Sequence, residues 1–310
     1  MLIQPGEPLQ GTGSDSPHAV QKQNMFACLD EIGGRELLRA QETKRPAGTR
    51  AGVPPHVWMY WHDGWDNAPE VAKLCLKSWR QQNGLWDVHA VDAAQLATLL
   101  PEPLEYHGRS RLAGFSDRVR LKLLRKYGGI WADATLFCAQ PADSWVHLLA
   151  APSLFFAFAF PAEDRTLASW FLAAAQNCRI LALWDTIVSA YFAHLEAERR
   201  WVHSYFFVHY ALEYVVNADP EAAALWATMP KIPVGAASTG RLASMAQLKA
   251  AEDSGGSLSA AQMETVAVLL RQFPLHKLTW KGQMQKGSGR ARRLLTALEA
   301  HLASENVPAS

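Results

Sequence analysis

The stretch Phe115 to Cys138, F-S-D-R-V-R-L-K-L-L-R-K-Y-G-G-I-W-A-D-A-T-L-F-C, decides the fold of this 310-residue chain. Its first half carries apolar side chains at every fourth position, which predicts a helix with one stripe facing a core. That stripe consists of Phe115, Val119, Leu123 and Tyr127. The Gly128-Gly129 pair predicts the end of this helix, because glycine adopts the left-handed conformation that closes a helix.

The second half of the stretch is interpreted as a short buried strand that carries one acid. The apolar residues of that strand are Ile130, Trp131, Phe137 and Cys138. Asp133 is its single charged residue, and a carboxylate in such surroundings is costly unless it is paired or bound to a cation. Helix, double-glycine turn and strand therefore deliver Asp133 towards a strand end, where open α/β sheets place ligands.

Two motifs in this stretch resemble those of a known family. The pattern S-D-x-x-R at 116–120, followed by Y-G-G-I-W-x-D at 127–133, is similar to glycosyltransferases of the sugar-binding DXD superfamily. Within it the capsular-polysaccharide-synthesis type matches best, and the resemblance is good over Val53 to Gln140. It implies a GT-A fold, a Rossmann-like α/β domain that binds a nucleotide-sugar. Thr135 stands where the family has the second acid of its motif.

The resemblance also implies roles for individual residues in catalysis. Asp117 matches an acid that contacts sugar hydroxyls, and Arg120 matches an arginine beside the sugar and phosphate, where a guanidinium fork suits vicinal oxygens. Asp133 and Thr135 would hold Mn²⁺ or Mg²⁺ together with diphosphate oxygens, although a hydroxyl is a weak ligand for these ions. The alternative interpretation of Asp117 and Arg120 is an ordinary pair on a helix surface.

The nucleotide is expected at the first strand of the sheet. A β-rich run from His56 to Trp61 predicts that strand, and the alternation of strands and helices from there to Cys138 predicts a doubly wound sheet. In the family, an aromatic ring at the end of this strand stacks on the nucleobase. Trp58 matches that ring by position, with Tyr60 and Trp61 near enough to contribute. The alternative for Trp58 is a residue of the hydrophobic core.

A second part of the donor site is expected near the C-terminus. In the family, polar residues of a C-terminal segment close over the diphosphate, and His276 and Lys277 match them. A lysine beside a histidine can balance the charge that grows on a departing UDP. The alternative interpretation of these two residues is an exposed basic turn.

The sequence divides into three predicted parts. Residues 1–52 form an extension that is partly disordered or holds one short helix, and 53–160 form the nucleotide-sugar-binding core. Residues 161–310 form a mainly helical acceptor-side lobe with a closing segment. Within this lobe, Leu167 to Gln176 is interpreted as a helix and Ala291 to Ser304 as the last one.

Composition narrows the class of protein. The chain is 49% hydrophobic and 19% charged with a formal net charge of +1, which is typical of a globular enzyme and disfavours a nucleic-acid partner. Its four cysteines form no C-x-x-C pair, which favours reduced thiols and a cytoplasmic location. No membrane-spanning run or signal-peptide pattern is expected. A surface-polysaccharide product would place the enzyme at the inner face of a membrane, and the basic segment Lys281 to Arg293 leaves peripheral membrane contact open.

These patterns together predict a glycosyltransferase of the hexosyltransferase type. It would move a sugar from a nucleotide-sugar, a UDP-sugar by resemblance, to a carbohydrate or glycolipid acceptor in capsular polysaccharide synthesis, with retention of configuration. Two alternatives stay open. One is a family member that binds a nucleotide or glycan without transfer, suggested by Thr135. The other is a nucleotide-sugar hydrolase in which Asp133 and the basic groups activate water.

Overall fold

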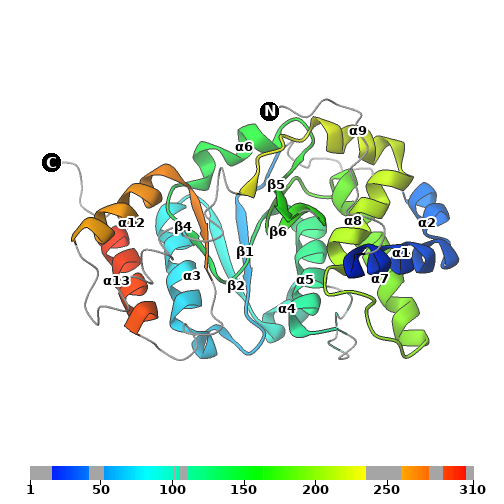
Figure 1. Ribbon diagram of the computed structural model, residues 1–310, viewed down its shortest axis with the longest axis horizontal. Helices are drawn as coiled ribbons and strands as arrows, with labels where there is room; N and C mark the ends of the chain where they lie inside the picture. The colour runs from blue at the N-terminus through cyan, green and yellow to red at the C-terminus, as the bar shows by residue number, and fades with distance from the viewer. Residues whose placement is uncertain are drawn as a thin grey trace. The chain divides into compact units, whose positions relative to one another are not determined.

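The computed structural model describes residues 16–41, 52–100, 110–162, 164–234, 260–278 and 289–304, together with 102, 104 and 106 (Figure 1). Its strands are β1 His56–Tyr60, β2 Asp87–Val91, β3 Gly129–Ala132, β4 Leu136–Cys138, β5 Phe155–Ala162, β6 Arg165–Ala174 and β7 Leu275–Lys277. Its helices are α1 Pro17–Glu31, α2 Gly34–Ala40, α3 Glu70–Gln82, α4 Ala93–Leu99, α5 Leu112–Tyr127, α6 Val146–Ala150, α7 Arg179–Ala197, α8 Phe207–Ala218, α9 Pro220–Thr228, α12 Ala260–Gln272 and α13 Gly289–Ser304, with short 3-10 helices η1 Trp65–Asn67 and η2 Ala142–Ser144.

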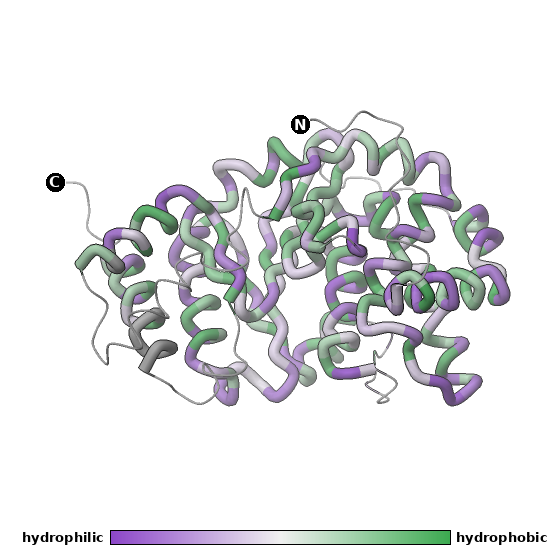
Figure 2. The backbone as a smooth tube through the Cα atoms, in the orientation of Figure 1, coloured by the Kyte–Doolittle hydropathy of each residue, from purple (hydrophilic) through white to green (hydrophobic). Residues whose placement is uncertain are grey.

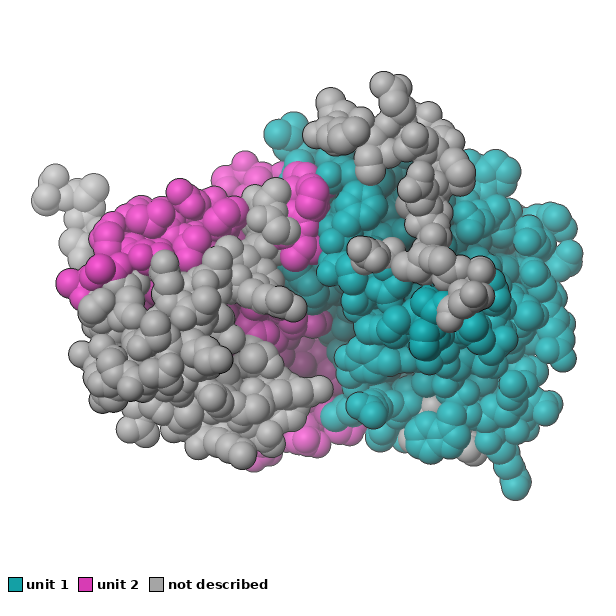
Figure 3. All heavy atoms as spheres, viewed as in Figure 1, with its two compact units in different colours: residues 1–54, 97–131, 146–231 teal, residues 55–96, 132–145, 232–310 magenta. Residues whose placement is uncertain are grey.

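The part of the chain that the structure describes forms a mixed α/β structure with two sheets, and the chain divides into two compact units. The five-stranded sheet has the order β2-β1-β3-β6-β5, and the two-stranded sheet pairs β4 with β7. Unit 1 comprises residues 1–54, 97–131 and 146–231, and unit 2 comprises 55–96, 132–145 and 232–310 (Figure 3). These units interleave along the chain, whereas the division expected from sequence is consecutive and stays a prediction. The predicted α/β fold class is confirmed.

Unit 2 contains the βαβ start that the sequence predicts. Strands β1 and β2 are parallel, with His56 opposite Asp87 and Tyr60 opposite Val91. Helix α3 connects them and starts directly after Pro69, its N-cap. Along α3 the backbone in Figure 2 alternates between hydrophobic and hydrophilic segments, as in an amphipathic helix with one buried face. On that face the Trp79 indole donates a hydrogen bond to the Leu136 carbonyl at 2.8 Å, which ties α3 to β4.

The predicted single strand from Ile130 to Cys138 is wrong in one respect. The chain forms β3, turns at Asp133, and continues as β4, so the acid lies in a turn after a strand. The Leu136 amide donates to the Asp133 carbonyl at 2.8 Å and closes this turn. The break arises because β4 pairs with β7 in the smaller sheet, and β7 is far away in sequence. No local pattern records such a partner.

The predicted helix before the double glycine is confirmed as α5 in unit 1. Gly128 follows it with a φ of 69°, in the left-handed region that favours glycine. A Cβ atom there would lie 2.7 Å from the Gln176 amide nitrogen and 2.8 Å from Cδ of Pro54. The position therefore requires glycine both for backbone conformation and for space.

Two sequence-based assignments in unit 1 are wrong. The segment from Leu167 to Gln176 is not a helix, since most of it lies in β6, which runs antiparallel to β5. Its alanines and leucines favour a helix locally, but pairing with the buried strand β5 overrides that preference. Near the N-terminus the sequence suggests one short helix from Met25 to Gln41 with a break at Gly33-Gly34, whereas the structure has two helices, α1 and α2, that separate at this break, and α1 begins earlier, at Pro17. Ser16 caps α1, its hydroxyl accepting from the Ala19 amide at 3.1 Å. Residues 1–15 lie outside the described part of the chain.

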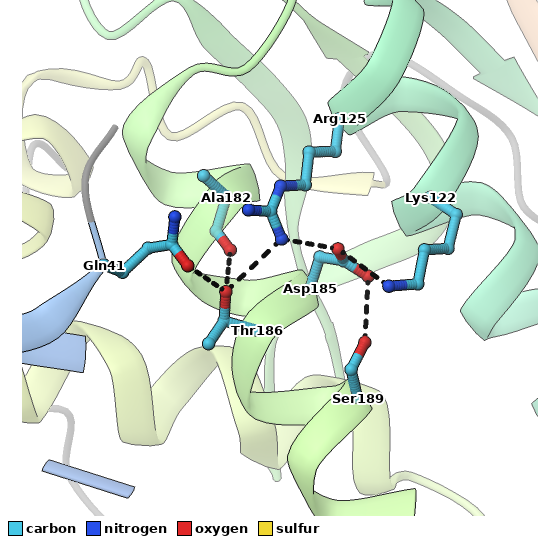
Figure 4. A network of polar contacts seen from close by, with 7 residues as sticks. All are labelled: Gln41, Lys122, Arg125, Ala182, Asp185, Thr186 and Ser189. Carbon is cyan, nitrogen blue, oxygen red and sulfur yellow. Dashed lines mark hydrogen bonds and ion pairs between the residues drawn. The ribbon is translucent and has the colours of Figure 1, made fainter. Parts of the chain in front are cut away.

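A buried ion-pair network holds the helices of unit 1 together (Figure 4). Asp185 on α7 is 2% exposed and lies 2.8 Å from Arg125 and 3.2 Å from Lys122, both on α5. Arg125 also donates to the Thr186 hydroxyl at 3.3 Å, and that hydroxyl donates to the Gln41 side chain at 2.9 Å. Lys122 and Arg125, two basic residues of the stretch from Phe115 to Cys138, therefore hold α5 against α7 in unit 1.

All four cysteines are buried and unbonded, as the sequence predicts. Burial raises the pKa of the Cys75 and Cys138 thiols, in the case of Cys138 to about 12, so both are protonated at neutral pH. Within the described residues, none of the helices combines the length and the apolar character that crossing a membrane requires.

Candidate functional site

The strongest candidate site in unit 2 is a cluster of three side chains around Asp133. The Lys277 ammonium donates to Oδ2 of Asp133 at 2.8 Å and to the Thr135 hydroxyl at 2.9 Å. Side chains of Asp133 and Lys277 are 24% and 22% exposed, whereas Thr135 is 6% exposed. The cluster is thus partly accessible to solvent, and the buried Thr135 hydroxyl anchors the Lys277 ammonium within it. Lys277 was predicted for the donor site. The structure brings it into contact with Asp133 and Thr135 of the motif, which precede it by 144 and 142 residues.

Strand pairing explains how Lys277 reaches the acid. In the two-stranded sheet Leu136 lies opposite Lys277 and Phe137 opposite His276. The Leu278 amide donates to the Thr135 carbonyl at 2.8 Å, so the backbone directly after Lys277 is hydrogen-bonded to the turn region. Because consecutive side chains of a strand point to opposite faces, His276 and Lys277 are separated from each other by the sheet.

In the observed arrangement of their side chains, Asp133 and Thr135 do not fit a divalent metal ion. It offers one carboxylate and one neutral hydroxyl, and both already accept hydrogen bonds from an ammonium. Two unit charges about 4 Å apart near a protein surface interact with about 4 kcal/mol, so the repulsion of a divalent ion by Lys277, about 8 kcal/mol, would offset its attraction to the single Asp133 carboxylate. Mn²⁺ or Mg²⁺ could bind here only if Lys277 moved away. The metal predicted for Asp133 and Thr135 stays a prediction that this arrangement does not favour.

His276 does not lie in an exposed basic turn, which was the alternative to its predicted role in the donor site. It is fully buried, and its Nε2 donates to the Phe273 carbonyl at 3.0 Å. Burial lowers the pKa of His276 to about 4, with His301 adding to the effect. A side chain in this position supports packing in unit 2, and its predicted contact with the diphosphate remains untested.

The lowered pKa of His276 predicts that the free energy of unfolding decreases as the pH falls below 6.5. In the unfolded chain the imidazole takes up a proton near pH 6.5, whereas in the folded protein it stays neutral down to about pH 4. Its contribution to the free energy of unfolding is therefore full above pH 6.5 and falls as the pH drops towards 4. At 1.36 kcal/mol per pH unit, the loss between pH 6.5 and 4.5 is about 2 kcal/mol. Thermal unfolding across this pH range would measure it.

The control for that measurement is His276→Gln, which keeps a donor for Phe273 but does not titrate in this range. Other groups, chiefly carboxylates, contribute to the pH slope of both proteins equally. The variant is expected to lose less stability than the wild type between pH 6.5 and 4.5, whatever its absolute melting temperature. Equal slopes would show that His276 does not stay neutral in the fold.

The aromatic residues predicted to bind a nucleobase lie on or next to β1 in unit 2. Trp58 is 2% exposed and its ring stacks on His89 at 4.1 Å, an arrangement typical of a core residue. Tyr60 is 6% exposed, and its hydroxyl lies 2.7 Å from Nδ1 of His62. Trp61 is partly exposed directly after the strand. Base stacking by these residues stays a prediction, and Trp58 in particular would need its ring face uncovered.

Asp117 and Arg120 lie in unit 1 and form a buried pair. Oδ1 of Asp117 is 2.9 Å from Nη2 of Arg120, with side-chain exposures of 12% and 5%. Arg120 also donates to the Ser169 carbonyl at 2.6 Å, and its guanidinium lies over the Trp131 ring at 5.1 Å. The alternative of a solvent-exposed pair on a helix surface is therefore wrong. Whether this pair contacts a sugar stays a prediction from the resemblance.

Comparison with known proteins places the chain in a family. A family model described as "Capsular polysaccharide synthesis protein" matches residues 15–293. The chain belongs to this family. The match includes the S-D-x-x-R helix, the turn with Asp133 and the strand with Lys277, so all the residues of the candidate site lie inside it.

The curated relatives of this chain are distant, and each aligns with only part of it. O-glycosyltransferase PaGT of Phomopsis amygdali is 27% identical over an alignment of 160 residues, with coverage of 43% of this chain and 38% of that protein. O-glycosyltransferase braB of Annulohypoxylon truncatum is 28% identical over an alignment of 123 residues, with coverage of 35% of this chain and 28% of that protein. The aligned parts thus span well under half of either relative. A solved structure titled "PaToxG Glycosyltransferase" is similar with a TM-score of 0.40 and 13% identity, covering 82% of this chain and 96% of that chain.

Proposed function

We propose that the protein is a glycosyltransferase that moves a hexosyl group from a nucleotide-sugar, with UDP-sugars as the first choice of donor, to a hydroxyl of a glycan or glycolipid. Family membership and the printed names of two partial relatives support the activity. A role in capsular polysaccharide synthesis at the cytoplasmic face of a membrane, and transfer with retention, belong to the same proposal. Product NMR, which reports the anomeric configuration, is the check on retention.

The observation that carries this proposal is the lysine held between Asp133 and Thr135. Transfer breaks the bond between the anomeric carbon and a phosphate oxygen, and the electron pair of that bond stays on the nucleoside diphosphate. An ammonium group has three N–H donors. Asp133 and Thr135 accept two of them, and within the described residues no further acceptor contacts Lys277. The third donor is thus available for a phosphate oxygen.

The arrangement is suited to stabilise the leaving group. A fixed donor with a full positive charge, aimed at an oxygen that gains negative charge, lowers the barrier because it needs no reorganisation during the reaction. Asp133 supplies the negative partner that holds the lysine side chain in one rotamer, and the buried Thr135 hydroxyl limits its movement further. In this proposal Lys277 takes the place that a divalent cation has in the family.

Binding of donors tests the proposal first. Nucleotides and nucleotide-sugars linked to UDP, GDP, TDP or CMP would be added to the protein with Mn²⁺, with Mg²⁺ or with EDTA, and the melting temperature measured. A ligand that binds only the folded state raises the melting temperature by mass action. We expect one nucleotide class to raise it, and to do so equally with metal and with EDTA, because Lys277 supplies the positive charge.

The other outcomes separate the alternatives. A rise in melting temperature that EDTA abolishes would contradict the role given to Lys277. It would instead support metal binding at Asp133. A rise without donor consumption under any condition would favour a binding protein that has lost transfer. Donor consumption that no acceptor accelerates would favour the hydrolase. If no nucleotide raises the melting temperature, the transferase proposal fails.

A further inference from the structure

A second cluster of potential ligands lies on β1 and β2 in unit 2, on a different sheet from Lys277. His56, Asp87 and His89 offer ring nitrogens and a carboxylate oxygen that all lie within 4.8 Å of one another. Among the described residues, this is the one group of three or more His, Cys, Asp or Glu side chains that meets such a spacing. Nothing in the proposed transfer reaction uses these three residues.

The strand register brings the three side chains together. His56 lies opposite Asp87, and Trp58 lies opposite His89, in the parallel pair of β1 and β2. Side chains two positions apart on a strand share a face, so Asp87 and His89 lie on the same face of the sheet as their partners on β1. The spacing of the cluster is therefore set by the backbone ladder rather than by a loop.

The distances match those of a tetrahedral metal site. Nε2 of His89 is 3.2 Å from Nδ1 of His56, and that Nδ1 is 3.6 Å from Oδ2 of Asp87. Zn²⁺ binds imidazole nitrogen and carboxylate oxygen at about 2.0–2.2 Å, which places neighbouring ligand atoms of a tetrahedron roughly 3.3–3.5 Å apart. The ligand atoms of the third pair, His89 and Asp87, lie within 4.8 Å of each other, so rotation of these side chains can bring all three to one ion.

The surroundings support a binding site at this position. The Trp58 ring stacks on the His89 imidazole with planes 13° apart, which holds that ring in one orientation. Asp87 is 74% exposed and His56 is 31% exposed at the side chain, so an ion can reach the cluster from solvent. Strand β2 is the outermost strand on one side of the five-stranded sheet, so the cluster lies at an edge of that sheet.

We propose that His56, Asp87 and His89 form a site for a divalent transition-metal ion such as Zn²⁺, with water in the remaining coordination position. Imidazole ligands favour ions of this class over Mg²⁺. The ion would link β1 to β2 at the edge of the sheet. The site is distinct from the Lys277 cluster, because the two sets of residues lie on separate sheets.

Titration of the full chain without a histidine tag tests the site. Calorimetry with Zn²⁺ is expected to show one saturable site per chain that excess Mg²⁺ does not displace, and bound Co²⁺ is expected to show the visible absorption of a tetrahedral complex. Replacing two ligands in His56→Ala/His89→Ala is expected to weaken Zn²⁺ binding by about 100-fold or more, since even partners behind the ligands contribute about 10–100-fold.

Two further variants keep the test decisive. Asp87→Ala removes a ligand that is largely exposed, so it weakens binding without endangering the fold. His147→Ala, on α6, removes an exposed histidine outside the cluster and is expected to bind Zn²⁺ as the wild type does. No saturable binding, or equal binding by the wild type and the double variant, would show that the two histidines only share a hydrogen bond. The melting temperature in EDTA confirms that each variant is folded.

Discussion

The Asp133→Asn variant is expected to slow sugar transfer because the Lys277 ammonium is no longer held in place, by up to the about 10²–10³-fold that follows removal of a fixed donor at a developing negative charge. Asparagine keeps the size of the side chain but removes the negative charge that holds the Lys277 ammonium 2.8 Å away. The loss corresponds to about 3–4 kcal/mol of transition-state stabilisation. Initial rates of donor consumption with saturating donor and acceptor would measure it.

A matched control comes from the same unit. Asp66 in η1 is an exposed acid, and Asp66→Asn is expected to leave the rate unchanged. The melting temperature of Asp133→Asn should stay near that of the wild type, because the side chain lies in a partly exposed turn. Transfer within tenfold of the wild-type rate would remove Asp133 from the reaction and leave it as the partner of a structural ion pair.

The Lys277→Ala variant is expected to show a loss of similar size and a new response to metal. Without the ammonium the leaving diphosphate has no fixed positive charge from this group, so the rate should fall by about 10²–10³-fold. The same change removes the repulsion that keeps a divalent ion from Asp133. Added Mn²⁺ should therefore raise the rate of Lys277→Ala, while it leaves the rate of the wild type unchanged.

Two comparisons make this result specific. Lys73→Ala removes another lysine of unit 2, one that is 42% exposed and lies 3.6 Å from Glu70, and it should transfer at the normal rate. The double variant Asp133→Asn/Lys277→Ala should be no slower than the slower single variant, because the two residues act as one group. Additive losses would mean that Asp133 and Lys277 act separately, and a wild-type rate that depends on Mn²⁺ would contradict the substitution of lysine for metal.

Local patterns were sufficient for much of unit 2 and for the first part of the site. The apolar run at β1, the helical stripe of α3 and the parallel return at β2 each follow from periodicities of two and 3.6 residues. The double glycine predicted the end of α5, and Asp133 was identified as a functional candidate from its apolar neighbours together with the S-D-x-x-R and Y-G-G-I-W-x-D motifs. These features are encoded within a dozen residues or so, which is the range over which burial and propensity leave a signature.

Other features depend on partners that are distant in sequence. The segment at β6 has the composition of a helix, yet pairing with β5 makes it a strand. The ion pair of Asp133 with Lys277 joins residues 144 positions apart, and the sequence could suggest both as donor-site residues but not their contact. The cluster of His56, Asp87 and His89 left no motif, because it depends on which residues of β1 and β2 lie opposite one another. An Asp-x-His pair on one strand beside a histidine on the strand before it is the signal that could have suggested it.

By itself, the sequence determined the fold class, the family and the residue on which the proposed chemistry centres. It did so because hydrophobic period, turn glycines, an acid among apolar residues and the two family motifs are all properties of neighbouring residues. The tertiary structure decided which cation faces Asp133, that His276 is buried rather than exposed, and which histidines share a face of the sheet. Those choices follow from strand pairing and burial between distant segments, whose free energy belongs to the packed fold and not to any single stretch of the chain.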